Sequence, residues 1–432
     1  MDSQAPICLV NEIKQMGRGH MVGQLDGPLG QQGKEQSSPL VDPVWVIAIA
    51  ELFGSSLWFS ANSATDDLMR AWDLGASDIG WLTNAVQLGF ILGTLFVALS
   101  GLADRVSAAK LFAGSALVGA LCNALFALGS DGMASGLLLR FLVGICLAGI
   151  YPLGMKLIVS WAPDRAGSAL ALLVGMLVLG TALPHLNRLL GADFSWRWVI
   201  LASSILALCA AGMVGWLGEG PHLRQVKKAP GTPRLEVITA FGIPRFRAAA
   251  LGYFGHMWEL YAFWTLLPLL VIRAAEDPSL AWLGVSGLSF AVIAIGAVGC
   301  FLGGMISRRV GGARVAAVAL SVSGLSCLLF ALFGDVLPPL GLALLLLVWG
   351  ISIPADSPQF SALSAKACPP HLVGGALAIQ NSIGFTITVV AIALTTALVS
   401  SLGASVAWVL LPGPILGLVG CYPLWKKDSV KV

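Results

Sequence analysis

Twelve runs of mostly apolar residues follow one another along this chain, and they constrain its fold more than any other feature. A bilayer core is about 30 Å thick, so a helix that spans it needs about 20 mostly apolar residues. Lipid accepts only helices or closed barrels, and barrel strands need only about 10 residues. The runs therefore predict membrane-spanning helices, at 44–65, 79–100, 109–129, 134–160, 168–190, 196–217, 247–272, 283–306, 314–334, 338–363, 373–398 and 402–424.

The composition excludes several other classes of protein. Apolar residues make up 57% of the 432 residues and charged residues only 11%, whereas a soluble domain carries roughly 25% charged residues. This excludes a soluble enzyme, a nucleic-acid binder and a disordered scaffold. The sequence contains no P-loop, GxSxG or HExxH arrangement, so we expect no enzyme activity, catalytic residue, metal site or cofactor.

Lysine and arginine are distributed unequally between the segments that join the runs. With the N-terminus inside, the inner segments hold 19 of the 25 Lys and Arg residues and the outer segments hold 4. Positive residues collect on the cytoplasmic side, so both termini are predicted to be cytoplasmic, in a bacterial inner membrane. The predicted parts are a disordered cytoplasmic tail (1–43), a six-helix bundle (44–217), a central cytoplasmic loop (218–246), a second six-helix bundle (247–425) and a cytoplasmic tail (426–432).

The two halves of the sequence repeat weakly. The segment that begins at Gly101 (GLADRVSAAK) has a counterpart 203 residues later, at Gly304 (GMISRRVGGAR). The fourth and tenth runs also match, with GIYP ending at Pro152 and GISIP ending at Pro354. Two repeated halves around a midplane site are the architecture of many secondary transporters.

The loop after the second run is similar to a signature of the major facilitator superfamily, roughly G-x-L-[AS]-D-R-x-G-R-[RK]. The signature's glycine and second arginine are replaced here by Ser107 and Ala108, and the matching positions are Gly101, Ala103, Asp104, Arg105 and Lys110. Arg140 to Gly144 and the segment 161–167 (WAPDRAG) also resemble family motifs. The resemblance covers roughly 44–425 and implies an all-α polytopic membrane protein, with twelve transmembrane helices in two pseudo-symmetric six-helix bundles.

The loop motif predicts a gate on the cytoplasmic side, formed by Gly101, Asp104, Arg105, Asp164 and Arg165. Asp104 would face the partial positive charge at a helix N-terminus, that of the eleventh helix. Arg105 would pair with Asp164, and Arg165 would close on Asp104. A solvated turn that follows the positive-inside rule is the alternative interpretation.

Three acidic residues lie within the predicted spans: Glu51, Glu259 and Asp356. A charge at a helix centre costs about 2.5–3.5 kcal/mol on insertion scales, and protonation removes much of that cost. We therefore predict that these residues carry protons, although structural pairing is an alternative. Pro354 and Pro358 flank Asp356 and each frees a backbone carbonyl, which predicts a broken helix there.

Arg140 lies inside the fourth span and is predicted to bind an anion or to pair with a titrating acid, with snorkelling to the interface as the alternative. Other polar and aromatic side chains deep in the spans are candidates for contact with the substrate. Interhelical hydrogen bonding explains the polar ones equally well. The predicted substrate-binding residues are Arg140, Trp58, Asn62, Gln87, Tyr151, Trp264, Gln359 and Asn381.

Together these features predict a secondary active transporter that moves a small solute by alternating access. An organic or inorganic anion is favoured as the substrate and a sugar is possible. The expected partners are this small molecule, a coupled proton in symport and the lipid bilayer, with no nucleic acid, for a monomeric protein. A drug/proton antiporter and a membrane-embedded sensor stay open as alternatives.

Overall fold

Helices make up the regular structure of the described chain. The structure is a computed structural model that describes residues 42–191, 194–222, 236–369 and 372–428, and these contain no strand. Nearly all of the predicted tail at 1–43 lies outside these ranges. Residues 223–235 of the predicted central loop and 429–432 of the predicted C-terminal tail also lie outside them.

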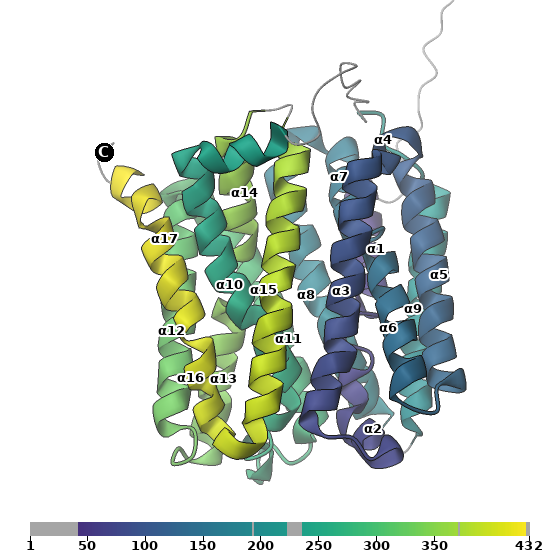
Figure 1. Cartoon of the computed structure of the whole chain (residues 1–432), viewed down its shortest axis with the longest axis vertical. Coiled ribbons are helices and arrows are strands. Elements are labelled where there is room, and N and C mark those ends of the chain that lie inside the picture. Colours follow the sequence, from purple (N-terminus) through teal and green to yellow (C-terminus); the bar gives the residue numbers. More distant parts are fainter. Residues whose placement is uncertain (1–41, 192–193, 223–235, 370–371, 429–432) are drawn as a thin grey trace, which may run out of the picture. The chain divides into compact units, whose positions relative to one another are not determined.

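The helices are long in most of the predicted spans and short in the segments between them (Figure 1). We call α1–α9 the N-terminal half and α10–α17 the C-terminal half of the sequence. The N-terminal half contains α1 (Pro43–Ser55), η1 (Asn62–Ala64), α2 (Thr65–Trp72), α3 (Ala76–Ser100), α4 (Leu102–Arg105), α5 (Ala108–Gly129), α6 (Met133–Leu147), α7 (Tyr151–Trp161), η2 (Pro163–Arg165), α8 (Ala166–Leu190) and α9 (Trp196–Leu217). After η3 (Glu236–Gly242), the C-terminal half contains α10 (Pro244–Leu270), η4 (Ala274–Glu276), α11 (Gly284–Val310), α12 (Gly312–Phe333), α13 (Pro339–Ser352), α14 (Ser357–Ala367), α15 (Val373–Leu402), η5 (Gly403–Val406), α16 (Ala407–Leu410) and α17 (Pro412–Asp428).

Ten helical stretches in the described chain are long and apolar enough to cross a membrane. The first predicted span is shorter than expected, because α1 is a 13-residue helix. The last two predicted spans form one stretch, Val373–Trp425, within which Gly403 has a positive φ of 56°. The predicted count of twelve is therefore reached only when α1 is included and this stretch is divided at Gly403.

Three of the predicted spans are interrupted near their middle. The break between α13 and α14 includes Pro354, and it confirms the broken helix predicted there. The chain also leaves helical geometry after Ser55 and between α6 and α7, which the sequence analysis did not predict. At the second of these breaks, a Cβ on Gly149 would lie 2.0 Å from Ser115 Oγ, so the close approach of α5 requires a glycine.

Helices from the two halves of the sequence pack along each other. Helix α3 lies beside α15 and α8 beside α11 (Figure 1). The first pair is very close, since a Cβ on Gly80 would lie 2.2 Å from Thr396 Oγ1. Asn84 Nδ2 also donates a hydrogen bond to the carbonyl of Val389 (3.1 Å). Small residues and polar bonds of this kind are typical of helix packing in membranes.

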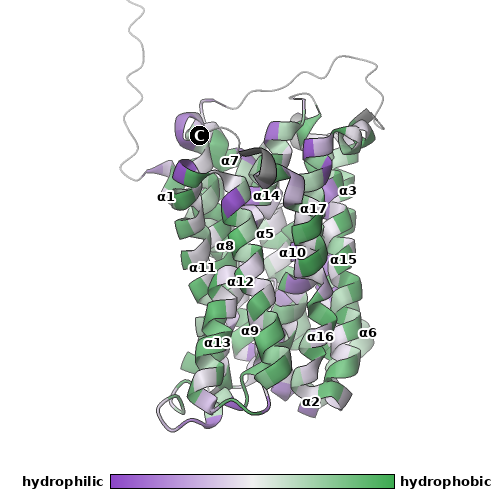
Figure 2. Ribbon diagram, turned by 90° about the vertical axis from the view of Figure 1, so that its left-hand side faces the viewer, coloured by the Kyte–Doolittle hydropathy of each residue, from purple (hydrophilic) through white to green (hydrophobic). Residues whose placement is uncertain are grey.

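The outward faces of the helices carry many exposed apolar side chains, such as Phe96, Leu121 and Ile205. Figure 2 shows hydrophobic residues along most of the helix length and hydrophilic ones mainly near the helix ends. A soluble monomer rarely exposes so much apolar surface. The distribution is therefore that of a surface in contact with lipid.

Candidate functional site

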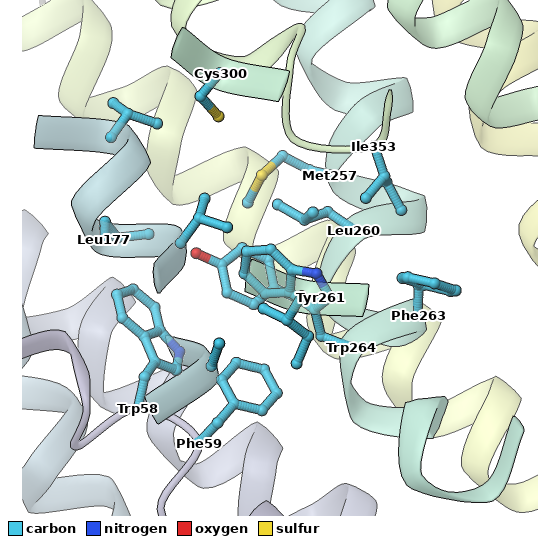
Figure 3. Close-up of a cluster of buried hydrophobic side chains, with 14 of the residues drawn as sticks. Trp58, Phe59, Leu177, Met257, Leu260, Tyr261, Phe263, Trp264, Cys300 and Ile353 are labelled. Carbon is cyan, nitrogen blue, oxygen red and sulfur yellow. The ribbon is translucent and has the colours of Figure 1, made fainter. Parts of the chain in front are cut away.

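The centre of the helical bundle holds aromatic rings contributed by both halves of the sequence. Trp58 follows α1, and its ring lies 4.9 Å from that of Phe90, 5.5 Å from that of Tyr261 and 5.7 Å from that of Phe385. Figure 3 shows Trp58 and Phe59 facing Tyr261 and Trp264 of α10. The rings come from the turns after α1 and from α3, α10 and α15, so they would have to separate if the two halves moved apart.

A small cavity of about 30 Å³ lies beside these rings. This volume is about that of one water molecule, too small for an organic ligand. We call it the central cavity; its polar and aromatic walls come from Tyr151, Tyr253, Tyr261, Trp264, Ser357 and Phe385. The structure therefore shows a closed centre, in which a solute would have to displace side chains.

Several buried polar atoms near the centre have no hydrogen-bond partner in the described chain. They include Nε1 of Trp58, Nε1 of Trp264 and both amide atoms of Gln87. All three side chains are almost fully buried. An unpaired buried donor costs about 1–3 kcal/mol. A bound solute or water would recover that cost, which supports the selection of these three residues as candidates for substrate binding.

Glu51 is fully buried on α1. Its Oε1 accepts a hydrogen bond from Ser55 Oγ (3.1 Å), one turn along the helix. Its Oε2 has no partner among the described residues. This oxygen lies so close to Gly154 that a Cβ at position 154 would be only 2.4 Å from it. Glycine at 154 thus makes room for the carboxyl group between α1 and α7.

Glu259 occupies the corresponding helix of the C-terminal half, but each oxygen of its carboxyl group accepts a hydrogen bond. Ser323 Oγ donates to Oε2 (2.7 Å) and Trp349 Nε1 donates to Oε1 (2.6 Å). The ring of Trp349 packs 4.4 Å from that of Phe263. Ser323 was missed from the sequence, because one serine within an apolar span carries no signal of its own.

Asp356 lies in the break between α13 and α14 and contacts an imidazole. His256 Nδ1 of α10 is 2.7 Å from Asp356 Oδ1, an ion-pair distance without hydrogen-bond geometry. Both side chains are 1% exposed. His256 is one turn before Glu259, so the structure places an imidazole beside two of the three predicted proton carriers.

Arg140 is also buried; both terminal nitrogens of its guanidinium donate to the protein itself, while its Nε has no hydrogen-bond partner among the described residues. It donates to the carbonyls of Leu57 (3.1 Å) and Trp58, to Ser60 Oγ (2.9 Å) and to Asn123 Oδ1 (3.2 Å). These acceptors lie on or beside the turns after α1, where carbonyls have lost their helical partners. The contacts differ from those expected of an anion-binding side chain, and they satisfy carbonyls exposed by the unpredicted break after Ser55.

The remaining predicted substrate-binding residues are dispersed. Tyr151 lines the central cavity, whereas Asn62 donates to Thr83 Oγ1 (2.8 Å) and lines a separate cleft beside α2. Gln359 is buried on α14, with its Oε1 facing Gly312, and Asn381 is half-buried on α15. Neither Gln359 nor Asn381 lines the central cavity.

The predicted gate residues lie at the end of α3, on the short helix α4 and on η2. Gly101 ends α3 with φ 67°, a conformation that favours glycine. Arg105 and Asp164 are exposed and do not pair with each other. Arg165 pairs with Asp42 (2.7 Å), a residue that the sequence analysis assigned to the tail. The side chain of Asp104 lies outside the described part of the structure, so its predicted role stays a prediction.

Asp42 also caps α1, since it accepts a hydrogen bond from the backbone N–H of Val44. Partial burial works against ionisation, but this bond and Arg165 outweigh it and hold the pKa of Asp42 below its usual value. We expect Arg165→Gln to speed hydrogen exchange in the first turn of α1 by up to about fivefold, because exposed ion pairs contribute about 0.2–1 kcal/mol. Arg105→Gln is the control, and equal exchange in the two variants would contradict the pairing.

An all-helical chain with lipid-facing helices and a closed, partly polar centre is an integral multi-pass membrane protein. Residues 44–393 match the profile of the Major Facilitator Superfamily, and the chain belongs to this family.

Two curated relatives resemble parts of the chain. The Niacin transporter NiaP of Acinetobacter baylyi is 22% identical over 271 residues, which are 53% of this chain and 59% of the relative. The putative uncharacterized transporter YgaY of Escherichia coli is 29% identical over 172 residues, 37% of this chain and 40% of the relative. The matched regions thus span about half the length of these relatives.

A solved structure resembles the chain over most of its length. It is a crystal structure of a mutant of the nucleoside transporter NupG, with a TM-score of 0.66 and 15% sequence identity. The match covers 89% of this chain and 99% of the other. At this level of identity the likeness shows the fold alone.

Proposed function

We propose that this protein is a secondary transporter that moves a small organic solute by alternating access, coupled to protons. The observation that carries the proposal is the closed aromatic centre, because both halves of the sequence contribute rings and unpaired polar atoms to it. Rocking of the halves about the α3–α15 and α8–α11 contacts would open this centre to one side at a time. Its family and the names of its relatives support transport.

The substrate we propose is a small solute with an aromatic ring. The contacts of Arg140 remove the main support for an inorganic anion, whereas Trp58, Tyr261 and Phe385 offer flat faces for stacking. The unpaired nitrogens of Trp58 and Trp264 would donate to polar atoms on the ring's edge. One relative is named for niacin and the structural neighbour for nucleosides, and both compounds contain nitrogen-bearing rings.

The proton carriers we propose are Glu51, Glu259 and Asp356. Each carboxyl group is buried within a predicted span, where protonation removes the cost of the charge. The Arg165 end of the bundle would face the cytoplasm, as the excess of Lys and Arg in its loops indicates. We further propose that the protein acts as a monomer in a bacterial inner membrane.

Drug/proton antiport is the second candidate, supported by the same centre. A cationic amphiphile would stack on the rings and bring its charge toward the unpaired Oε2 of Glu51. Transport assays in proteoliposomes separate the two functions. Uptake of nicotinate or uridine driven by an inward proton gradient supports symport. Expulsion of an organic cation driven by the same inward proton gradient supports antiport.

Trp58→Leu should weaken binding of the proposed aromatic substrate by about 3- to 10-fold. One aromatic contact contributes about 0.5–1.5 kcal/mol in addition to the free energy of burying its apolar area. Isothermal titration of the purified protein measures this change. Trp196→Leu is a matched control, since Trp196 is also buried among rings but in a separate cluster with Trp72 and Phe126. Equal losses in the two variants would indicate general destabilisation and would overturn the central site.

A further inference from the structure

A cleft of about 330 Å³ opens beside α2, where the end of α8 meets the segment before α11. We call it the α2 cleft. Its volume lies in the range of small-molecule sites, about 300–1,000 Å³, and is roughly ten times that of the central cavity. Among its lining residues are Asn62, Asp67, Arg70, His185, Arg188 and Trp282.

One wall of the α2 cleft carries positive and negative side chains in equal number. Asp67 Oδ1 accepts a hydrogen bond from Arg70 (2.8 Å), and Asp67 Oδ2 forms an ion pair with Arg188 (2.7 Å). Asp66 adds a second carboxylate to the wall, so two positive and two negative side chains face the space. The wall therefore offers hydrogen-bonding groups without net charge, and it favours a neutral polar solute over an ion.

His185 supplies a polar atom that no protein group satisfies. Its side chain is 1% exposed, yet its Nε2 has no hydrogen-bond partner among the described residues. Because an unpaired buried nitrogen is costly, a site that leaves it unpaired indicates a missing partner. The residue lies in α8 and lines the α2 cleft. Its Nε2 itself has almost no exposed surface, so a molecule in the cleft becomes its partner when the imidazole turns toward the cleft.

The apolar part of the lining comes mainly from the C-terminal half. It contains Pro268, Leu283 and the indole of Trp282, which is 74% exposed. An exposed tryptophan is consistent with an interfacial anchor, but this one also lines a cavity. A flat ring placed in the cleft would cover Trp282 with its face and present its edge to His185.

We propose that the α2 cleft is a second binding site, separate from the central cavity, for a small planar heteroaromatic solute without net charge. His185 Nε2 hydrogen-bonds a polar atom on the ring's edge, and Trp282 packs on the ring's face. The paired charges of Asp67, Arg70 and Arg188 hold the polar wall in place. The site is present in the conformation in which the centre is closed.

Binding of two matched probes to the full-length protein tests this proposal. Nicotinamide and benzamide have the same shape and charge, but only nicotinamide has a ring nitrogen. We expect wild-type protein to bind nicotinamide about tenfold more tightly, the value of one hydrogen bond of about 1.4 kcal/mol. In His185→Leu this difference should disappear while the affinity for benzamide is unchanged. An equal loss for both probes, or no loss for either, overturns the role of His185.

Trp282→Ala tests the apolar part of the lining and is not expected to affect folding, since the side chain is mostly exposed. Both probes should bind several-fold more weakly, whereas Trp198→Ala, another exposed tryptophan that does not line the cleft, should change neither. Equal effects of the two variants overturn the assignment, as does failure of the wild-type protein to bind either probe. Nicotinate is a third probe, and binding tighter than that of nicotinamide would overturn the preference for a neutral solute.

The same variants separate this site from the proposed transport function. Trp58→Leu should leave the nicotinamide–benzamide difference at the cleft intact, because Trp58 does not line it. If wild-type protein binds nicotinamide through His185 but moves no solute into proteoliposomes, the transport proposal fails and the second site stands. If Trp58→Leu removes the probe difference, the probes bind at the centre and the second site is overturned.

Discussion

Proteoliposomes that carry Glu259→Gln are expected to exchange solute across the membrane at near the wild-type rate but to lose accumulation driven by a proton gradient. Glutamine keeps the shape of the side chain and one oxygen for Trp349 Nε1, while the hydroxyl of Ser323 can rotate to accept from the amide. What glutamine lacks is a proton that can be released. With one proton moved per solute, a gradient of one pH unit supports about a tenfold accumulation ratio, about 1.4 kcal/mol. The ratio should fall to about one in the variant.

Two further substitutions show whether that result is due to loss of the proton-carrying group. Ser323→Ala removes one hydrogen bond to Glu259 but leaves the carboxyl group, so coupling should persist. Glu51→Gln tests the repeat-related acid, whose Oε2 has no partner in the described chain. If both Glu→Gln variants accumulate solute normally, Asp356 with its contact to His256 becomes the remaining candidate. A wild-type protein that is indifferent to the proton gradient would reject coupling altogether.

Arg140→Lys is expected to destabilise the protein strongly while leaving the residual folded fraction able to bind solute. The arginine fork donates to four acceptors, two of them backbone carbonyls of the turns after α1. A lysine ammonium is a compact donor on a flexible stem and cannot span the same set. Losing one or two buried bonds to a charged group costs about 3 kcal/mol, which appears as a lower midpoint of thermal unfolding in detergent.

The control for Arg140→Lys is Arg105→Lys, because Arg105 is exposed. Its unfolding midpoint should match that of the wild type. The opposite pattern in Arg140→Lys, an unchanged midpoint together with lost solute binding, would restore the anion-binding interpretation. The two outcomes are measured on the same purified protein, so the structural and ligand-binding roles are separated directly.

The length of the apolar runs and the composition predicted the membrane class, and motifs of the Gly101 loop identified the family that the match of residues 44–393 confirms. Both depend on local chemistry, because lipid imposes one helix length and one kind of surface on every span. The break at Pro354 was predictable for the same reason, since proline acts on its own helix. Burial of Glu51, Glu259 and Asp356 was also expected from their positions within spans.

The sequence did not reveal which group each buried or charged side chain contacts. Arg140 was expected to bind an anion, yet its acceptors are the carbonyls of Leu57 and Trp58, more than 80 residues earlier in the chain. Arg165 pairs with Asp42, and Glu259 with Ser323 of α12, for similar reasons. Helical spacing defines which residues share a face but not which helix that face meets.

Sequence alone therefore determined what each segment is: apolar spans, the charge bias between loops and the acids that lie within the spans. The tertiary structure decided what each polar group contacts, which centre is closed and where a cleft remains open beside His185. The physical reason is the distance over which each kind of interaction acts. Hydrophobic length and proline act within one helix, whereas hydrogen bonds and ring contacts require a neighbour within a few ångströms, which only the packing of the helices on one another supplies.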